Sequence, residues 1–63
     1  MIAELGAIAK QEYGMSDADL KGAKFNLFRD YIFSRVSAEY LDQVWNDGGK
    51  TALINVVKTM INR

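Results

Sequence analysis

The tripeptide Gly49-Lys50-Thr51 combines residue types that can bind a phosphate group. Backbone amides beside a glycine, a lysine ammonium and a threonine hydroxyl are the groups that hold phosphates in P-loops. A complete P-loop also needs an earlier glycine, at the position of Val44, and a buried parallel strand before it. We therefore interpret the tripeptide as a turn that initiates a helix, with nucleotide binding as the alternative.

Two pairs of carboxylates, Asp17 with Asp19 and Glu39 with Asp42, are spaced closely enough to act as acid and base. Both pairs fall in first-turn or solvent-facing positions, where acidic side chains favour helix initiation and solubility. The sequence contains no His and no Cys, which removes the usual bases, nucleophiles and softer metal ligands. We expect no enzymatic activity, no metal site and no cofactor.

Length and composition predict one folded unit. The 63 residues are 49% hydrophobic and 25% charged, which is typical of a chain with a core, so we expect a single helical domain over residues 1–63. The eight basic and eight acidic residues balance, so the whole chain has no electrostatic attraction to nucleic acids or anionic membranes. No apolar stretch approaches the ~20 residues of a membrane helix, and we expect a cytoplasmic protein without a membrane partner.

Apolar periodicity predicts an all-α fold, a compact bundle of four short helices in which the second is the longest and lies at the centre. These helices are expected at about residues 2–13, 17–36, 38–46 and 50–62. Gly14 suits the end of the first helix, and Ser16 and Ser37 suit the N-caps of the second and third. The run Asn46-Asp47-Gly48-Gly49 is the strongest turn signal.

A β-hairpin at Asp47-Gly48 is the competing interpretation of this turn, with the β-branched run 54–57 in its second strand. A strand with one dry face would alternate apolar and polar residues. Odd and even positions of the segment 51–60 both mix the two kinds, which favours the helix.

The predicted central helix, 17–36, has two apolar arcs, which is more than one packing contact needs. The arc expected to form the core consists of Leu20, Ala23, Leu27 and Tyr31. The second arc consists of Phe25, Phe28, Ile32 and Val36, with Phe33 beside it. Flanking helices that cover both arcs are one interpretation. The other is that the second arc binds another chain.

We favour a non-enzymatic protein–protein interaction or regulatory module that self-associates, with a homodimer as the expected assembly. The expected partner-binding residues are Phe25, Phe28, Ile32 and Phe33. Phe33 is the main support for this hypothesis. It lies beside the polar residues Asn26 and Arg29, so a monomer would leave its ring exposed to water.

Residues 9–23 resemble a helix-turn-helix segment. If Gly14 is the turn glycine, Ser16 stands at the motif's helix cap. The apolar positions of the motif correspond to Ala9, Tyr13, Met15, Leu20 and Ala23. The motif's small residue is replaced by Lys10. The resemblance implies, as the alternative function, a small DNA-binding protein that uses residues 9–29. Its phosphate contacts would come from Lys10, Lys21, Lys24 and Arg29.

Overall fold

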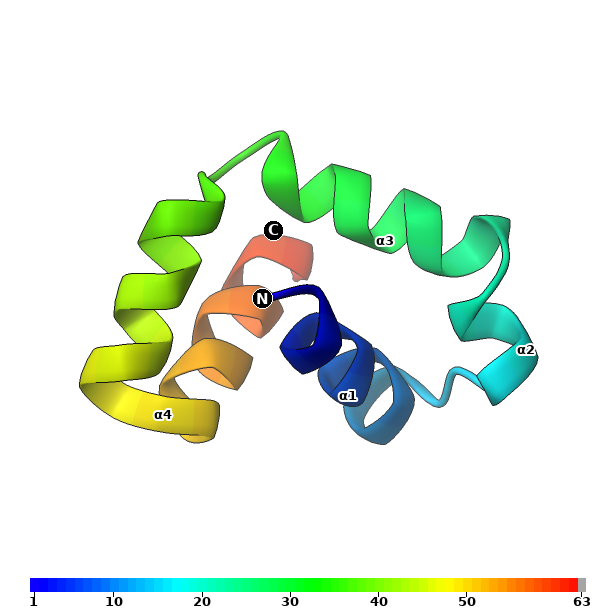
Figure 1. The fold of residues 1–63 in the computed structure, drawn as a ribbon, viewed down its shortest axis with the longest axis horizontal. Helices are drawn as coiled ribbons and strands as arrows, with labels where there is room; N and C mark the ends of the chain where they lie inside the picture. The colour runs from blue at the N-terminus through cyan, green and yellow to red at the C-terminus, as the bar shows by residue number, and fades with distance from the viewer. Residues whose placement is uncertain (63) are drawn as a thin grey trace.

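The computed structural model describes residues 1–62 and consists of four helices (Figure 1). They are α1 (Ile2–Tyr13), α2 (Asp17–Leu20), α3 (Ala23–Phe33) and α4 (Ala38–Ile61). No strand occurs within residues 1–62, so the predicted all-α class and the number of helices are confirmed. The lengths of the helices differ from the prediction, because α4 is the longest and the segment 17–36 is divided.

The junction between α1 and α2 follows the predicted signals. Gly14 ends α1 in the left-handed conformation, with φ 67°, which glycine adopts without a steric penalty. Ser16 then forms a capping box with Asp19: the Ser16 hydroxyl accepts a hydrogen bond from the Asp19 amide at 3.1 Å. In return the Asp19 carboxylate accepts one from the Ser16 amide at 3.1 Å.

The prediction of one long central helix over residues 17–36 is wrong. The chain leaves the helix after Leu20, and Gly22 takes an extended conformation as the N-cap of α3. The amides of Lys21 and Gly22 bond to the carbonyls of Ala18 and Asp19 at 3.2 Å, which closes a tight turn. Glycine weakens a helix interior by about 1 kcal/mol relative to alanine, so the break falls where helix propensity is lowest.

The third and fourth predicted helices, 38–46 and 50–62, are joined in α4. Residues 46–48 stay helical, and only Gly49 departs, with φ 69° and ψ −158°. Figure 1 shows the chain reversing direction at this bend, so that the second half of α4 runs back beside the first. The segment 50–61 is helical, so the β-hairpin interpretation is also wrong.

The core lies where α1, α3 and both halves of α4 meet. Its buried side chains are Leu5, Ile8, Ala9, Met15, Phe25, Ile32, Leu41, Leu53 and Val57. Phe28 borders it, with ring centroids 5.6 Å from Tyr13 and 6.0 Å from Phe25, the spacing of favourable aromatic pairs.

The two arcs of the segment 17–36 have exchanged the roles that we expected. Phe25 and Ile32 are buried, whereas Leu27 is 72% exposed and Tyr31 is 37% exposed. The break at Gly22 lets α3 rotate independently of α2, and the arc with more apolar area faces inward. Tyr31 keeps its hydroxyl near the surface, because a buried hydroxyl would need a hydrogen-bond partner inside the core.

Truncation of a core residue in the second half of α4 should destabilise the fold strongly. We expect Leu53→Ala to lower the free energy of unfolding by about 2–5 kcal/mol, because the cavity lies in the centre of the core. The matched change Leu27→Ala should alter it by no more than about 0.5 kcal/mol, since that side chain is in water. Urea denaturation followed by circular dichroism measures both. Equal losses would contradict the assigned core.

Candidate functional site

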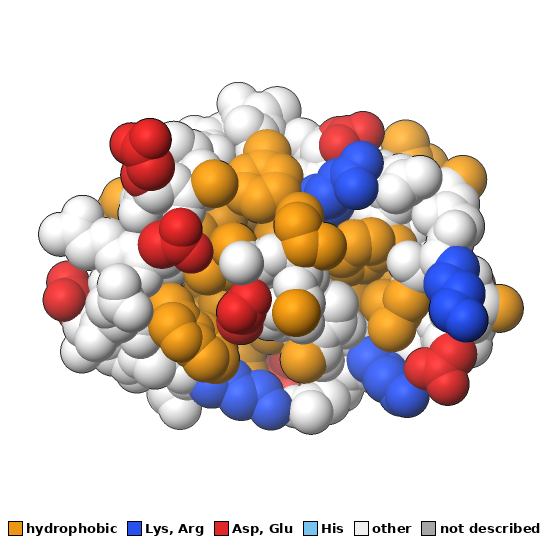
Figure 2. Space-filling view, in the orientation of Figure 1, with side chains coloured by type: hydrophobic (Ala, Val, Ile, Leu, Met, Phe, Trp, Pro, Cys, Tyr) orange, Lys and Arg blue, Asp and Glu red, His pale blue; other side chains and the backbone are white. Residues whose placement is uncertain are grey.

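The outward arc of α3 carries the most exposed large hydrophobic side chain of the described residues, Leu27. Tyr31 lies one turn further along the same helix, so the two side chains form a continuous stripe. Figure 2 shows apolar side chains gathered across the middle of one face of the molecule, with most charged side chains towards its edge. Exposed apolar side chains that adjoin one another are typical of binding surfaces.

A hollow of about 310 Å³ adjoins this stripe. It is lined by Val36, Tyr40, Asn55, Val56, Thr59 and Met60, which come from the connection between α3 and α4 and from both halves of α4. The Tyr31 hydroxyl donates a hydrogen bond to the Met60 carbonyl at 3.1 Å and so links the stripe to the hollow. We call Leu27, Tyr31 and the lining of this hollow the α3–α4 surface.

An arginine extends the polar edge of the α3–α4 surface. The guanidinium carbon of Arg35 lies 4.5 Å from the centroid of the Tyr31 ring, within the range of a cation–π contact. This contact holds the guanidinium beside the hollow and orients the tyrosine ring. Asp30, with its side chain 68% exposed, lies between Leu27 and Tyr31 in sequence and brings a negative charge to the same region.

The predicted partner-binding residues do not form a common outward surface. Phe25 is 6% exposed and Ile32 is fully buried, so neither can contact a partner in the folded chain. Phe28 and Phe33 are partly buried and pack against the core. The sequence did contain a signal for which arc stays at the surface. Of the two arcs, only the one with Tyr31 carries a hydroxyl group, and a hydroxyl favours a position near water.

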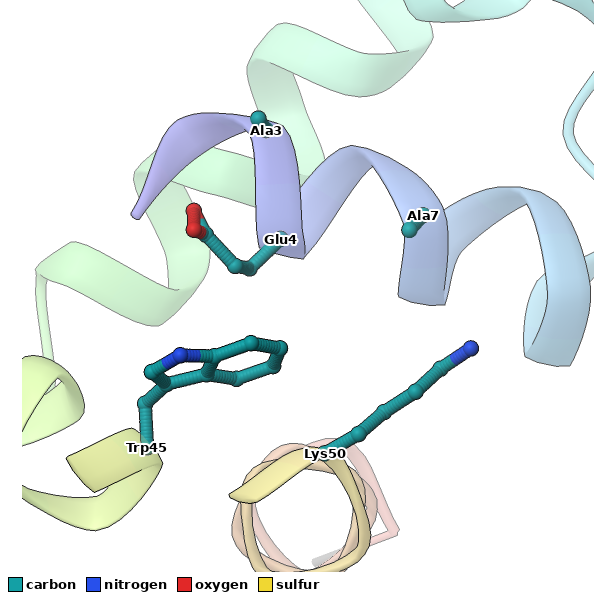
Figure 3. Close-up of a pocket in the computed structure, with 5 residues that line it drawn as sticks. All are labelled: Ala3, Glu4, Ala7, Trp45 and Lys50. Atoms are coloured by element: carbon teal, nitrogen blue, oxygen red, sulfur yellow. The ribbon is translucent and has the colours of Figure 1, made fainter.

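A second hollow, of about 250 Å³, lies between α1 and the two sides of the α4 bend (Figure 3). It is lined by Ala3, Glu4, Ala7, Trp45 and Lys50. Both of its charged side chains already have partners. The N-terminal ammonium lies 3.0 Å from the Glu4 carboxylate, and its hydrogen bond lowers the pKa of Glu4. The Lys50 ammonium donates to the Gln11 side-chain oxygen at 2.5 Å.

This arrangement bears on the phosphate-loop alternative. Lys50 extends towards α1, as Figure 3 shows, and Gly49 is a bend within a helix instead of part of a loop of amides. The hollow therefore contains Lys50 and the Trp45 indole but not the series of backbone N–H donors with which a P-loop binds phosphate.

The residues predicted to contact DNA phosphates are mostly paired with carboxylates. Lys10 lies 2.7 Å from Asp17, Lys24 lies 3.6 Å from Asp19, and Arg29 lies 3.3 Å from Asp30. Lys21 is exposed and has no ion pair within the described part of the chain. The expected recognition helix is a single turn, because α2 ends at Leu20.

Other sites are sparse in this fold. Residues 1–62 contain no group of three or more acidic side chains placed to share a metal ion. None of the helices described has both the length and the apolar character needed to cross a membrane. Comparison with protein-family models, curated proteins and solved structures found no match for this chain. Function must therefore be inferred from the exposed residues themselves.

The capping box predicts a pH-dependent stability. The hydrogen bond from the Ser16 backbone, assisted by Lys24, lowers the pKa of Asp19. A carboxyl group with a lowered pKa stabilises the fold above its unfolded pKa, and this contribution is lost as the pH falls through the folded value. Between about pH 5 and pH 3, the melting temperature of Asp19→Asn should therefore fall less steeply than that of the unmodified chain.

The matched control for this titration is Asp42→Asn, which removes the same charge from an exposed position on α4. It should retain the steep acid dependence of the unmodified chain. Identical slopes for the Asp19 and Asp42 variants would show that the capping carboxylate does not contribute to acid sensitivity.

Proposed function

We propose that this chain is a small, non-enzymatic interaction module that forms a homodimer through the α3–α4 surface. The observation that carries the proposal is the 72% exposure of Leu27 beside Tyr31 and an apolar hollow. Water contact with this surface is unfavourable by about 25 cal/mol for each Å² of apolar area, and a partner removes that contact.

The shape of the surface supports a second copy as the partner. A homodimer with a two-fold axis uses the same patch twice, so a protrusion on each chain must meet a recess on the other. Leu27 is the protrusion and the hollow between Val36 and Val56 is the recess, and Tyr31 lies between them. If the axis passes near Tyr31, the two α3 helices run antiparallel and each Leu27 side chain enters the hollow of the other copy.

The charges near the surface support the same arrangement. Asp30, which pairs with Arg29 within the chain, is close to the protrusion, and Arg35 is close to the hollow, so an antiparallel pair brings a second cation towards the Asp30 carboxylate. Exposed ion pairs contribute little affinity, but they fix orientation and disfavour the parallel alternative. The composition also suits an interface core, because Tyr, Met and Arg are enriched in such cores and acidic residues are depleted.

A module of this kind acts by binding, and we propose a regulatory role for it. The chain carries no Cys, which suits a reducing compartment, and the cytoplasm is the proposed location. Its activity would then depend on concentration through the equilibrium between monomer and dimer.

Leu27→Asp should weaken the dimer about 10- to 100-fold in Kd, because two carboxylates would be forced into apolar recesses. Sedimentation velocity over a series of micromolar concentrations measures the change. Circular dichroism should show unaltered helical content, since the side chain is outside the core.

The matched control is Asn26→Asp, which adds the same charge at the neighbouring exposed position of α3 but about 100° around the helix. It should dimerise like the unmodified chain. An unmodified chain that stays monomeric throughout, or a Leu27→Asp variant with unchanged Kd, contradicts the proposed function.

A further inference from the structure

The bend of α4 depends on two adjacent glycines. Gly49 has φ 69° and ψ −158°, a conformation that residues with a side chain rarely adopt. At Gly48 an added Cβ would lie 2.5 Å from the Cβ of Ala52, which is closer than real Cβ atoms approach. Within a straight helix the Cβ atoms of residues four apart are about 5–6 Å apart, so the same methyl group would fit.

The helical segment 50–61 is held in place by side-chain contacts across the fold. Leu53 and Val57 are fully buried in the core. The Lys58 ammonium lies 2.6 Å from the Glu12 carboxylate on α1, and the Met60 carbonyl accepts the hydrogen bond from Tyr31 on α3. In each of these contacts one partner belongs to residues 50–61 and the other to the rest of the fold. The site on α1 and α3 therefore recognises residues 50–61 and does not require that they come from the same chain.

We propose that Gly48-Gly49 is a hinge through which two copies of this chain exchange residues 50–61. In the exchanged form α4 is one straight helix of 24 residues, about 36 Å long. Straightening removes Leu53 and Val57 from their own core, and the same segment of the second copy fills the vacancy. Each chain thereby regains the Lys58–Glu12 ion pair and the Tyr31–Met60 hydrogen bond.

The second copy is the partner that fits this site, because it alone presents the same side chains at the same spacing. The exchange does not use Leu27 or the hollow beside it, so it goes beyond the proposed function and stands independently of it. Glycine at both hinge positions favours the bent monomer over the straight form, since each glycine is a poor helix former and accepts the bend without strain. Replacing the glycines should reverse that preference.

The experiment measures the distance between the two halves of α4 in a single chain. The chain has no Cys, so Tyr40→Cys and Thr59→Cys provide unique sites for spin labels. Residues 40 and 59 line the same hollow in the bent form. They are separated by 19 positions, and a straight helix would place them about 28 Å apart. Labelled chains are diluted with unlabelled chains of the same variant, so that pulsed electron spin resonance reports distances within one chain.

All proteins carry Leu27→Asp, which weakens pairing through the α3–α4 surface, and are measured at concentrations below the weakened Kd. With both glycines present, this background should be monomeric with a short distance between the labels. Adding Gly48→Ala and Gly49→Ala should convert it to a dimer with the distance near 28 Å. Gly48→Ala alone, which leaves the positive φ to a glycine, should give both forms, with the dimer fraction increasing with protein concentration.

The matched control is Gly6→Ala in α1, where an added Cβ meets no atom within 4 Å. This variant should remain monomeric and bent although it also replaces a helical glycine. A short distance in the double alanine variant overturns the exchange. An unfolded monomer at every concentration overturns it too, because a second copy should restore the core. Failure of the proposed function is a separate result, read from the Kd of Leu27→Asp with both glycines in place.

Discussion

The packing of Leu53 and Val57 against α1 and α3 is the contact on which the remaining structure depends. The chain is short, and every helix but the single turn α2 must contribute to one core. The second half of α4 reaches that core only because the chain reverses at Gly49. Without the reversal, a single chain would leave the apolar faces of α1 and α3 uncovered, and a domain of this size has no second core to compensate.

The reversal also creates the surface features from which function is inferred. One hollow lies between the two halves of α4 and the connection from α3, and the other lies between α1 and the bend. Because Phe25 and Ile32 fill the inward side of α3, Leu27 and Tyr31 are left on its outward side. The same orientation of α3 therefore determines both the packing of the core and the residues of the candidate surface.

Local signals in the sequence predicted much of the fold. Gly14, Ser16 and Ser37 end or cap helices as expected, because capping depends on residues within a few positions of one another. The rotation of α3 could not be predicted in this way. Periodicity identifies two arcs but does not say which one faces inward, and the break at Gly22 separates α3 from the register of α2. For that reason Phe25 and Ile32, which we expected to bind a partner, are buried, whereas Leu27 and Tyr31, which we expected in the core, are exposed.

The only tryptophan of the chain, Trp45, stands at the junction of three segments. Figure 3 shows its indole beneath α1, on the side of Glu4, with the Lys50 side chain extending away from it towards the other end of α1. Trp45 is 37% exposed, so part of the residue faces water and part is shielded. Any movement of α1 away from α4 changes the polarity around the indole. The protein thus contains its own fluorescent reporter of closure, which registers the state of the fold without an attached dye.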